Sequence, residues 1–210
     1  KFFAPSPGAR SLSMNTNRFR FADGAPGSAE ERKASLRAYM KKRRGENENR
    51  DAKEDLLLEN FIRSGAAEKE RFFVYLSFSS EAPTDKLVAY LLAAGKKVYS
   101  PVTEGNRMYA AAYGKDFSLS SFGIREPVGE EYKGGLDVAV LPLLAVDGRG
   151  ARLGYGRGYY DRFLAERPEV LTVAYCYDFQ IVREVPETAG DRRVSMIVSD
   201  KRVLRCPCRV

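Results

Sequence analysis

The chain has 210 residues, 44% of them hydrophobic and 30% charged, which is typical of a soluble globular protein, and no apolar run approaches the ~20 residues that a membrane-spanning helix needs. It contains no histidine, and this excludes Ser-His-Asp and Cys-His nucleophiles and histidine-ligated zinc sites. The 35 basic and 28 acidic residues leave a net charge of +7, which favours anionic partners such as nucleotides, polyglutamate tails or nucleic acid.

The chain begins with a segment, residues 1–27, that is rich in Ser, Asn, Arg, Pro and Gly and shows no hydrophobic period. We interpret it as an N-terminal arm without a catalytic role; a transit-type sequence and residues left from expression are the alternatives. Residues 28–210 are expected to form a single domain. Its cysteines, Cys176, Cys206 and Cys208, lack the C-x-x-C spacing of metal and redox motifs. We therefore expect reduced thiols in a cytoplasmic protein, with organellar targeting by the arm as the alternative.

Helix and strand patterns alternate through this domain. The capping box Ser28-Ala-Glu-Glu31 predicts a helix over residues 28–44, and a second helix over residues 50–64 should end at Gly65. A third helix is expected over residues 85–95. Strands are expected at residues 72–78, 96–102, 107–113, 136–146, 170–177 and 194–199, with a loop at 119–127. This alternation predicts a three-layer α/β fold, in which a mainly parallel sheet carries helices on both faces.

A glycine-rich turn, Arg152-Leu-Gly-Tyr-Gly-Arg-Gly-Tyr-Tyr-Asp161, joins a buried strand to a helical pattern. Its three glycines remove side chains that would keep backbone N–H groups away from a ligand. The start of the helix adds partial positive charge, and the two arginines match the geometry of phosphate oxygens. The turn therefore predicts a site for a phosphate-bearing ligand; a tight turn in a basic surface loop is the alternative.

Carboxylates and tyrosines near this turn have two interpretations each. Asp161 could hold Mg²⁺ against bound phosphates or cap the helix that begins beside it. Asp191, in a later loop, is a second candidate ligand for Mg²⁺; the alternative is that its side chain is only solvated. Tyr159 and Tyr160 could stack on a flat heterocycle or pack in the core.

Three further candidates lie outside the turn. Lys33 and Arg37 are four residues apart on one face of the first helix, and they bear on the site only if that helix lies across the turn. Glu81 follows the first strand, where ligands of α/β sheets bind; its alternative is a surface acid.

The glycine-rich turn, preceded by Leu141-Pro-Leu-Leu-Ala-Val-Asp147, resembles the signature of the 5-formyltetrahydrofolate cyclo-ligase family, also called methenyltetrahydrofolate synthetase. Four supporting segments lie in the family's order: Lys33-Ala-Ser-Leu-Arg37, Tyr75-Leu-Ser-Phe-Ser-Ser-Glu81, Phe122-Gly-Ile-Arg-Glu-Pro127 and residues 185–191. The resemblance covers residues 29–199. It implies the α/β fold of the glucosamine-6-phosphate deaminase and ribose-5-phosphate isomerase group. It also implies ATP- and Mg²⁺-dependent conversion of 5-formyltetrahydrofolate to 5,10-methenyltetrahydrofolate, with release of ADP and phosphate.

The resemblance also implies a mechanism and its residues. In the family the formyl oxygen attacks the γ-phosphoryl group to give an imidate phosphate at N5, and N10 then closes the ring as phosphate leaves. A basic site without histidine suits this chemistry, because phosphoryl transfer depends mostly on positioning and charge neutralisation. The catalytic residues implied are Arg152, Tyr159 and Tyr160. The residues implied for ATP are Lys33, Arg37, Arg152, Leu153, Gly154, Tyr155, Gly156, Arg157, Gly158, Tyr159 and Tyr160. Those implied for the folate are Leu76, Glu81, Phe122, Tyr155 and Tyr159, and those for Mg²⁺ are Asp161 and Asp191.

Three positions depart from the family's usual sequence. Leu143 replaces a glycine and would hinder a close approach of the backbone, Val146 replaces a phenylalanine, and Arg157 stands where Gly or Lys is common. We expect a monomer that acts on small molecules, with no membrane or nucleic-acid partner. The alternative function, motivated by the net charge, is a non-catalytic basic module on the same fold that binds RNA. A ligase for another pterin or amide is a third reading.

Overall fold

A computed structural model describes residues 28–207, so the predicted arm at residues 1–27 and Cys208 lie outside the described residues. The helices are α1 (Ala29–Gly45), α2 (Arg50–Arg63), α3 (Asp85–Ala93) and α4 (Tyr159–Ala165), with 3-10 turns η1 (Ala66–Glu68) and η2 (Asp178–Gln180). The strands are β1 (Arg71–Val74), β2 (Lys97–Glu104), β3 (Arg107–Ala112), β4 (Phe117–Leu119), β5 (Arg125–Pro127), β6 (Val138–Leu141), β7 (Ala145–Asp147), β8 (Arg152–Leu153), β9 (Leu171–Cys176), β10 (Ile181–Val182), β11 (Met196–Ser199) and β12 (Val203–Arg205).

Helix α1 begins, and helix α2 ends, at the signals predicted from the sequence. The Ser28 hydroxyl accepts a hydrogen bond from the Glu31 amide, and the Glu31 carboxylate accepts one from the Ser28 amide. This capping box satisfies N–H groups that have no partner in the first turn of α1. After α2, Gly65 has a φ of +79°, a left-handed conformation that glycine adopts without a steric penalty. No helix of residues 28–207 is long and apolar enough to cross a membrane.

The main sheet has seven strands in the order β12-β11-β9-β6-β1-β2-β3. The strands from β11 to β2 pair in parallel, whereas β12 and β3 pair antiparallel at the two edges. The central strands β1, β6 and β9 are almost entirely buried, as expected for parallel strands covered on both faces. The predicted mixed α/β fold with a mainly parallel sheet is confirmed; its likeness to the glucosamine-6-phosphate deaminase and ribose-5-phosphate isomerase group stays a prediction.

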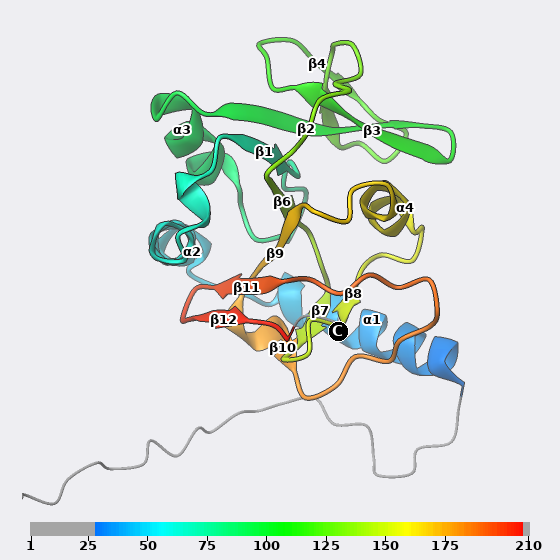
Figure 1. Cartoon of the computed structure of the whole chain (residues 1–210). Helices are drawn as coiled ribbons and strands as arrows, with labels where there is room; N and C mark the ends of the chain where they lie inside the picture. Colours follow the sequence, from blue (N-terminus) through cyan, green and yellow to red (C-terminus); the bar gives the residue numbers. More distant parts are fainter. Residues whose placement is uncertain (1–27, 208–210) are drawn as a thin grey trace, which may run out of the picture.

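Helices cover both faces of this sheet (Figure 1). On one face, α2 and α3 bury Leu57 and Leu87 against Phe72 and other side chains of the central strands. On the opposite face, Phe163 of α4 stacks on Phe73 with ring centroids 4.4 Å apart. Neighbouring residues of β1 enter different clusters because successive side chains of a strand point to opposite faces. This arrangement confirms the predicted three layers.

The apolar run predicted as one strand, residues 136–146, is two strands in different sheets. β6 ends at Leu141, and β7 belongs to a small sheet in the order β10-β7-β8. Pro142 separates the strands because proline has no N–H group for a strand ladder. Leu36 and Met40 of α1 pack against this small sheet. The division therefore brings α1 next to the glycine-rich turn, whose first two residues form β8.

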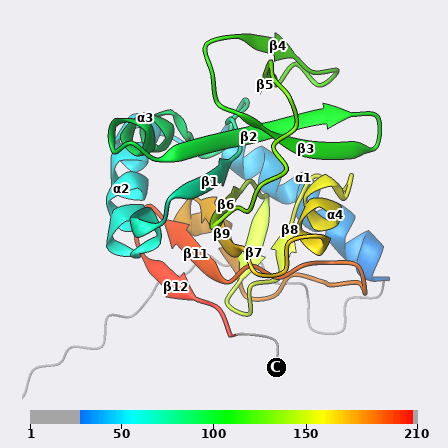
Figure 2. The same ribbon diagram turned by 45° about the horizontal axis from the view of Figure 1, so that its top comes forward.

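Two other predictions are wrong in part. The strand predicted to reach residue 78 ends at Val74, because the Tyr75 carbonyl accepts a hydrogen bond from the Thr84 hydroxyl at 2.9 Å instead of continuing the ladder. The loop predicted at 119–127 is largely a hairpin, in which β4 and β5 pair antiparallel and lie above β2 in the view of Figure 2. Strands of two or three residues, including β8, β10 and β12, are too short to show the alternation by which strands are predicted.

Gly150, in the link between β7 and β8, should not tolerate a side chain. Its φ is +86°, and a Cβ atom there would lie 2.3 Å from the Val194 carbonyl oxygen. Gly150→Ala should lower the free energy of unfolding by about 1–3 kcal/mol, because the left-handed backbone and the clash both penalise alanine. Thermal unfolding measures this. Gly148→Ala is the matched control, because a Cβ at Gly148 meets nothing within 4 Å; equal melting temperatures for the two variants would contradict the prediction.

Candidate active site

A cavity of about 940 Å³ opens beside the ends of β1 and β6, the side of an α/β sheet where ligands bind. Its wall comes from α1, the loop after β1, the β4–β5 hairpin, the glycine-rich turn and residues 188–191. Every residue with a predicted site role lines it: Lys33, Arg37, Leu76, Glu81, Phe122, Arg152, Leu153, Gly154, Tyr155, Gly156, Arg157, Gly158, Tyr159, Tyr160, Asp161 and Asp191. The fold thus brings these residues together, whereas their individual roles stay predictions.

Asp147 holds the backbone on both sides of the glycine-rich turn. Its buried carboxylate accepts hydrogen bonds from the amides of Arg149 at 2.9 Å, Ala151 at 3.2 Å and Val185 at 3.0 Å. The Arg149 guanidinium adds an ion pair at 2.7 Å. The first two amide bonds reverse the chain between β7 and β8, and the third fixes the start of the loop that carries Asp191.

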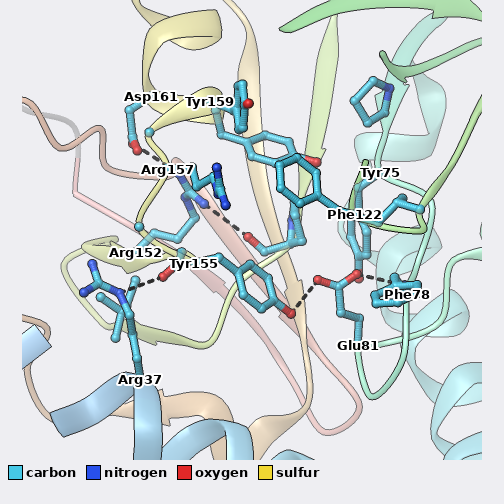
Figure 3. A pocket seen from close by; sticks show the side chains of 18 of the residues that line it. Arg37, Tyr75, Phe78, Glu81, Phe122, Arg152, Tyr155, Arg157, Tyr159 and Asp161 are labelled. Carbon is cyan, nitrogen blue, oxygen red and sulfur yellow. Dashed lines mark hydrogen bonds and ion pairs between the residues drawn. The ribbon is translucent and has the colours of Figure 1, made fainter. Parts of the chain in front are cut away.

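Helix α1 lies across the glycine-rich turn. Arg37 Nε donates a hydrogen bond to the Gly154 carbonyl at 3.2 Å (Figure 3). Gly156 has a φ of +98°, and a Cβ atom there would come within 3.4 Å of the Arg37 guanidinium. The condition under which Lys33 and Arg37 bear on the site is therefore met, and a glycine at 156 allows the close approach of the two segments.

Lys33 and Asp191 form an ion pair at one end of the cavity. The Lys33 Nζ atom is 2.7 Å from Asp191 Oδ2, and it also donates to the Thr188 hydroxyl at 2.9 Å. Burial alone would raise the pKa of Asp191, but the hydrogen bonds from Lys33 and Thr188 outweigh it and lower the pKa. Asp191 is therefore a charged, partnered carboxylate and not the solvated side chain of the alternative interpretation.

Arg152 and Asp161 form a second ion pair in the same region. The Arg152 guanidinium donates to the Pro142 carbonyl at 3.2 Å and to Asp161 Oδ1 at 3.1 Å. Its Nε atom is buried and has no hydrogen-bond partner among the described residues. The Arg192 amide, which follows Asp191, also donates to Asp161 Oδ1, at 3.3 Å. The two predicted Mg²⁺ ligands therefore lie on neighbouring segments. Within residues 28–207, no cluster of three or more acidic or cysteine side chains suited to a metal is found.

The other end of the cavity contains a buried carboxylate, that of Glu81. Its Oε1 atom accepts a hydrogen bond from the Tyr155 hydroxyl at 2.7 Å, and its Oε2 atom accepts one from the Phe78 amide at 2.9 Å. Figure 3 shows these three residues converging. Burial raises the pKa of Glu81, and the hydrogen bonds from Tyr155 and Phe78 and the charge of Arg44 oppose that shift. Glu81 is 7% exposed, which rules out the interpretation as a surface acid.

Aromatic side chains border the same end. Phe122, on the β4–β5 hairpin, meets Tyr159 edge to face with centroids 6.5 Å apart, and the Arg157 guanidinium lies 4.6 Å from the Phe122 ring. The Tyr159 hydroxyl donates to the Gly105 carbonyl at 2.7 Å. Tyr160 packs against Phe73 and both large core clusters while still lining the cavity. Both interpretations of Tyr160, as a core residue and as a site residue, therefore agree with its position.

The sequence analysis missed one buried cation of the cavity wall, Arg44 at the end of α1. Among Lys42, Arg43 and Arg44 it looked like one of several basic residues that favour a helix C-terminus. Its spacing carried a signal, because Arg44 follows Arg37 by seven residues, or about two helical turns, and so shares its face.

The departures at Leu143 and Val146 concern the core. Both side chains belong to the cluster between α4 and the sheet. The Leu143 carbonyl accepts hydrogen bonds from Gln180 at 2.8 Å and Arg44 at 3.1 Å. A leucine at 143 is therefore compatible with this backbone.

The chain belongs to the 5-formyltetrahydrofolate cyclo-ligase family, whose model matches residues 29–200. The 5-formyltetrahydrofolate cyclo-ligase of Escherichia coli K12 is 33% identical over 141 residues, which cover 62% of this chain and 78% of that protein. The mouse protein of the same name is 29% identical over 187 residues, covering 79% and 92%. The solved structure of Aquifex aeolicus 5,10-methenyltetrahydrofolate synthetase superposes with a TM-score of 0.73 at 28% identity, covering 85% and 94%. The family inferred from the sequence motifs is confirmed, and it is a family of enzymes.

Replacing Asp147 should destabilise the turn that carries the site. Asp147→Asn leaves buried amides without a charged acceptor, so the free energy of unfolding should fall by about 2–4 kcal/mol. Denaturant unfolding followed by circular dichroism measures the loss. The matched control, Arg149→Gln, removes the ion pair but leaves the three amide bonds to Asp147; because the Arg149 side chain is 49% exposed, it should cost less than Asp147→Asn. Equal losses would mean that the ion pair, and not the amide bonds, holds the turn.

Proposed function

We propose that this member of the 5-formyltetrahydrofolate cyclo-ligase family converts 5-formyltetrahydrofolate to 5,10-methenyltetrahydrofolate, with ATP and Mg²⁺, and releases ADP and phosphate. One observation carries the proposal: a single cavity has cations and a glycine-rich backbone at one end and a buried carboxylate among aromatic rings at the other. A triphosphate requires the first environment, and a flat heterocycle with N–H donors requires the second.

At the cationic end, Lys33, Arg37 and Arg152 would bind the phosphates of ATP. Arg152 supports this assignment most directly, because its buried Nε atom has no partner among the described residues. A buried donor without an acceptor calls for an explanation, and a phosphate oxygen would supply the acceptor. The residues from Leu153 to Gly158 would border the nucleotide, with glycines at 154, 156 and 158 that keep the backbone accessible.

Asp161 and Asp191 are proposed to hold Mg²⁺. Their chemistry fits the ion, because Mg²⁺ in nucleotide sites usually binds one or two carboxylates together with phosphate oxygens. Each carboxylate now pairs with a cation, Arg152 or Lys33, so both are available as charged oxygen ligands when those cations bind phosphate instead. When bound, the ion would neutralise phosphate charge and orient the transferred group.

At the other end, Glu81 would accept hydrogen bonds from N–H groups of the pterin. Both of its oxygens already accept hydrogen bonds, and each carboxylate oxygen has a second lone pair for a ligand. Phe122, Tyr155 and Tyr159 would contact the ring, and Leu76, which is 6% exposed, would form part of the apolar wall.

The reaction then follows from placing both ligands in one cavity. The formyl oxygen attacks the γ-phosphoryl group, ADP leaves, and an imidate phosphate forms at N5. N10 attacks the same carbon, the C–O bond to phosphate breaks as the ring closes, and the N10 proton leaves with the phosphate. Arg152 would stabilise the charge on the transferred group, and Tyr159 and Tyr160 would hold the reactants in line.

The activity has a direct test. Purified protein mixed with 5-formyltetrahydrofolate, ATP and Mg²⁺ should produce the absorbance of the methenyl product, with one ADP per product molecule. Omitting ATP is the control and should abolish turnover. Folded protein that makes no product would contradict the proposal. Tight RNA binding that falls steeply with salt, without folate turnover, would instead favour the basic RNA-binding alternative.

The two ends of the Arg152–Asp161 ion pair should differ in their effects. Arg152→Ala should raise the KM for ATP by roughly tenfold or more, because it removes a charged hydrogen-bond donor. Asp161→Asn should mainly raise the Mg²⁺ concentration needed for half-maximal rate. Steady-state kinetics at varied ATP and Mg²⁺ measure both effects. Arg63→Ala and Asp55→Asn, at side chains 73% and 61% exposed, are matched controls. Wild-type kinetics in both site variants would show that the assignment of this end is wrong.

A further inference from the structure

Arg44 joins three segments of the cavity wall. It lies in the last turn of α1 and is 4% exposed. Its Nε atom donates to the Ser80 hydroxyl at 3.0 Å, its Nη1 atom donates to the Leu143 carbonyl at 3.1 Å, and its Nη2 atom donates to the Tyr155 hydroxyl. Because a guanidinium presents its donors in one rigid plane, this side chain fixes the loop after β1, the link after β6 and the glycine-rich turn relative to one another.

The contacts of Arg44 continue to Glu81 through Tyr155. The Tyr155 hydroxyl accepts from Arg44 and donates to Glu81 Oε1 at 2.7 Å. Burial and the neighbouring carboxylate raise the pKa of Tyr155, so its hydroxyl keeps the proton that it donates. Hydrogen bonds in such a chain polarise one another. We call this chain of Arg44, Tyr155 and Glu81 the Arg44 relay.

Other charged and titratable groups around Glu81 do not duplicate the Arg44 relay. Those that face Glu81 from neighbouring elements are Arg44, Arg50, Tyr75, Tyr155, Tyr160 and Tyr177. Arg50 and Tyr177 contact the Glu81 backbone carbonyl and not its carboxylate. The remaining tyrosines carry no positive charge. Among the described residues, Arg44 is therefore the cation that hydrogen-bonded side chains connect to the Glu81 carboxylate.

We propose that Arg44 is a positioning residue, which acts through Tyr155 to orient the Glu81 carboxylate toward the pterin and to couple it to the turn that borders ATP. This inference rests on the proposed function. It has a consequence for pH dependence, because the charge of Arg44 opposes the rise in the pKa of Glu81 that burial causes. Without that charge the pKa of Glu81 should rise. As the pH falls, Glu81 should then take up its proton at a higher pH than in the wild type, and the carboxylate that binds the folate is lost there.

The test measures kcat and the KM values of both substrates as a function of pH. Arg44→Gln should raise the KM for 5-formyltetrahydrofolate by roughly tenfold, the effect of one lost charged hydrogen bond, and should raise the KM for ATP less. The acidic limb of kcat/KM for the folate should move to higher pH. Lys42→Gln removes the same charge from a side chain that is 80% exposed, and it should leave the kinetics unchanged.

Two further variants separate charge from geometry. Arg44→Lys keeps the charge but cannot serve three acceptors in one plane, so the folate KM should rise while the acidic limb stays near its wild-type position. Tyr155→Phe removes the bridging hydroxyl. It should raise the folate KM, and in the double variant with Arg44→Gln the two effects should be less than additive, because both break the same chain.

The outcomes distinguish this inference from the proposed function. A wild-type enzyme without turnover would overturn both. An active wild type together with an Arg44→Gln variant of unchanged folate KM and pH profile, whatever its melting temperature, would overturn the inference alone. If Arg44→Gln does not fold, Arg44→Lys and Tyr155→Phe decide: a raised folate KM in both variants would support the inference, and an unchanged folate KM in either would overturn it.

Discussion

The candidate active site depends on the buried carboxylate of Asp147. By accepting three backbone hydrogen bonds, it closes the turn between β7 and β8 and ties that turn to Val185 on a distant segment. One of these segments leads into the glycine-rich turn, and the other leads to Asp191. A buried charge is stable only when hydrogen bonds replace its hydration. The same requirement that stabilises Asp147 therefore also sets the two loops side by side.

Side chains of helix α1 hold the other segments of the cavity wall in place. Lys33, Arg37 and Arg44 lie on one face of it, and each meets an acceptor on another segment: Asp191, the Gly154 carbonyl and the Tyr155 hydroxyl respectively. Lys33 and Arg44 are buried, and buried cations need such partners. The protein provides these partners from its own segments, and they hold the three side chains in place on the cavity wall. Part of the basic surplus of the chain is thus used within the site and is no evidence for an RNA-binding surface.

The cavity joins two chemical environments through one residue, Tyr155. Its backbone belongs to the glycine-rich turn, and its hydroxyl contacts both Arg44 and Glu81. Tyr155 therefore links the backbone of the glycine-rich turn directly to the Glu81 carboxylate. The β4–β5 hairpin adds Phe122 to the aromatic rings at this end of the cavity, so part of the aromatic border comes from a separate two-stranded sheet that lies against β2.

Much of this could be predicted from the sequence. The capping box at Ser28, the left-handed glycine at 65 and the helical spacing of Lys33 and Arg37 are local features, set by residues close together in the chain. The glycine-rich turn indicated an anion site for the same reason, and its resemblance to a family led to many, but not all, of the residues that line the cavity. The division at Pro142 and the β4–β5 hairpin were not predicted. The first depends on which sheet each half of an apolar run joins, and the second consists of strands too short to show a period.

The sequence by itself determined the mainly parallel α/β architecture, the lack of histidine chemistry and many of the residues that line the cavity. Only the tertiary structure decided how those residues are partnered. Lys33 bonds to Asp191 across 158 positions of the chain, Arg44 meets Tyr155 across 111, and Tyr155 meets Glu81 across 74. No local pattern encodes such pairs, because they form only when the sheet has brought the ends of its strands together and α1 has packed over them.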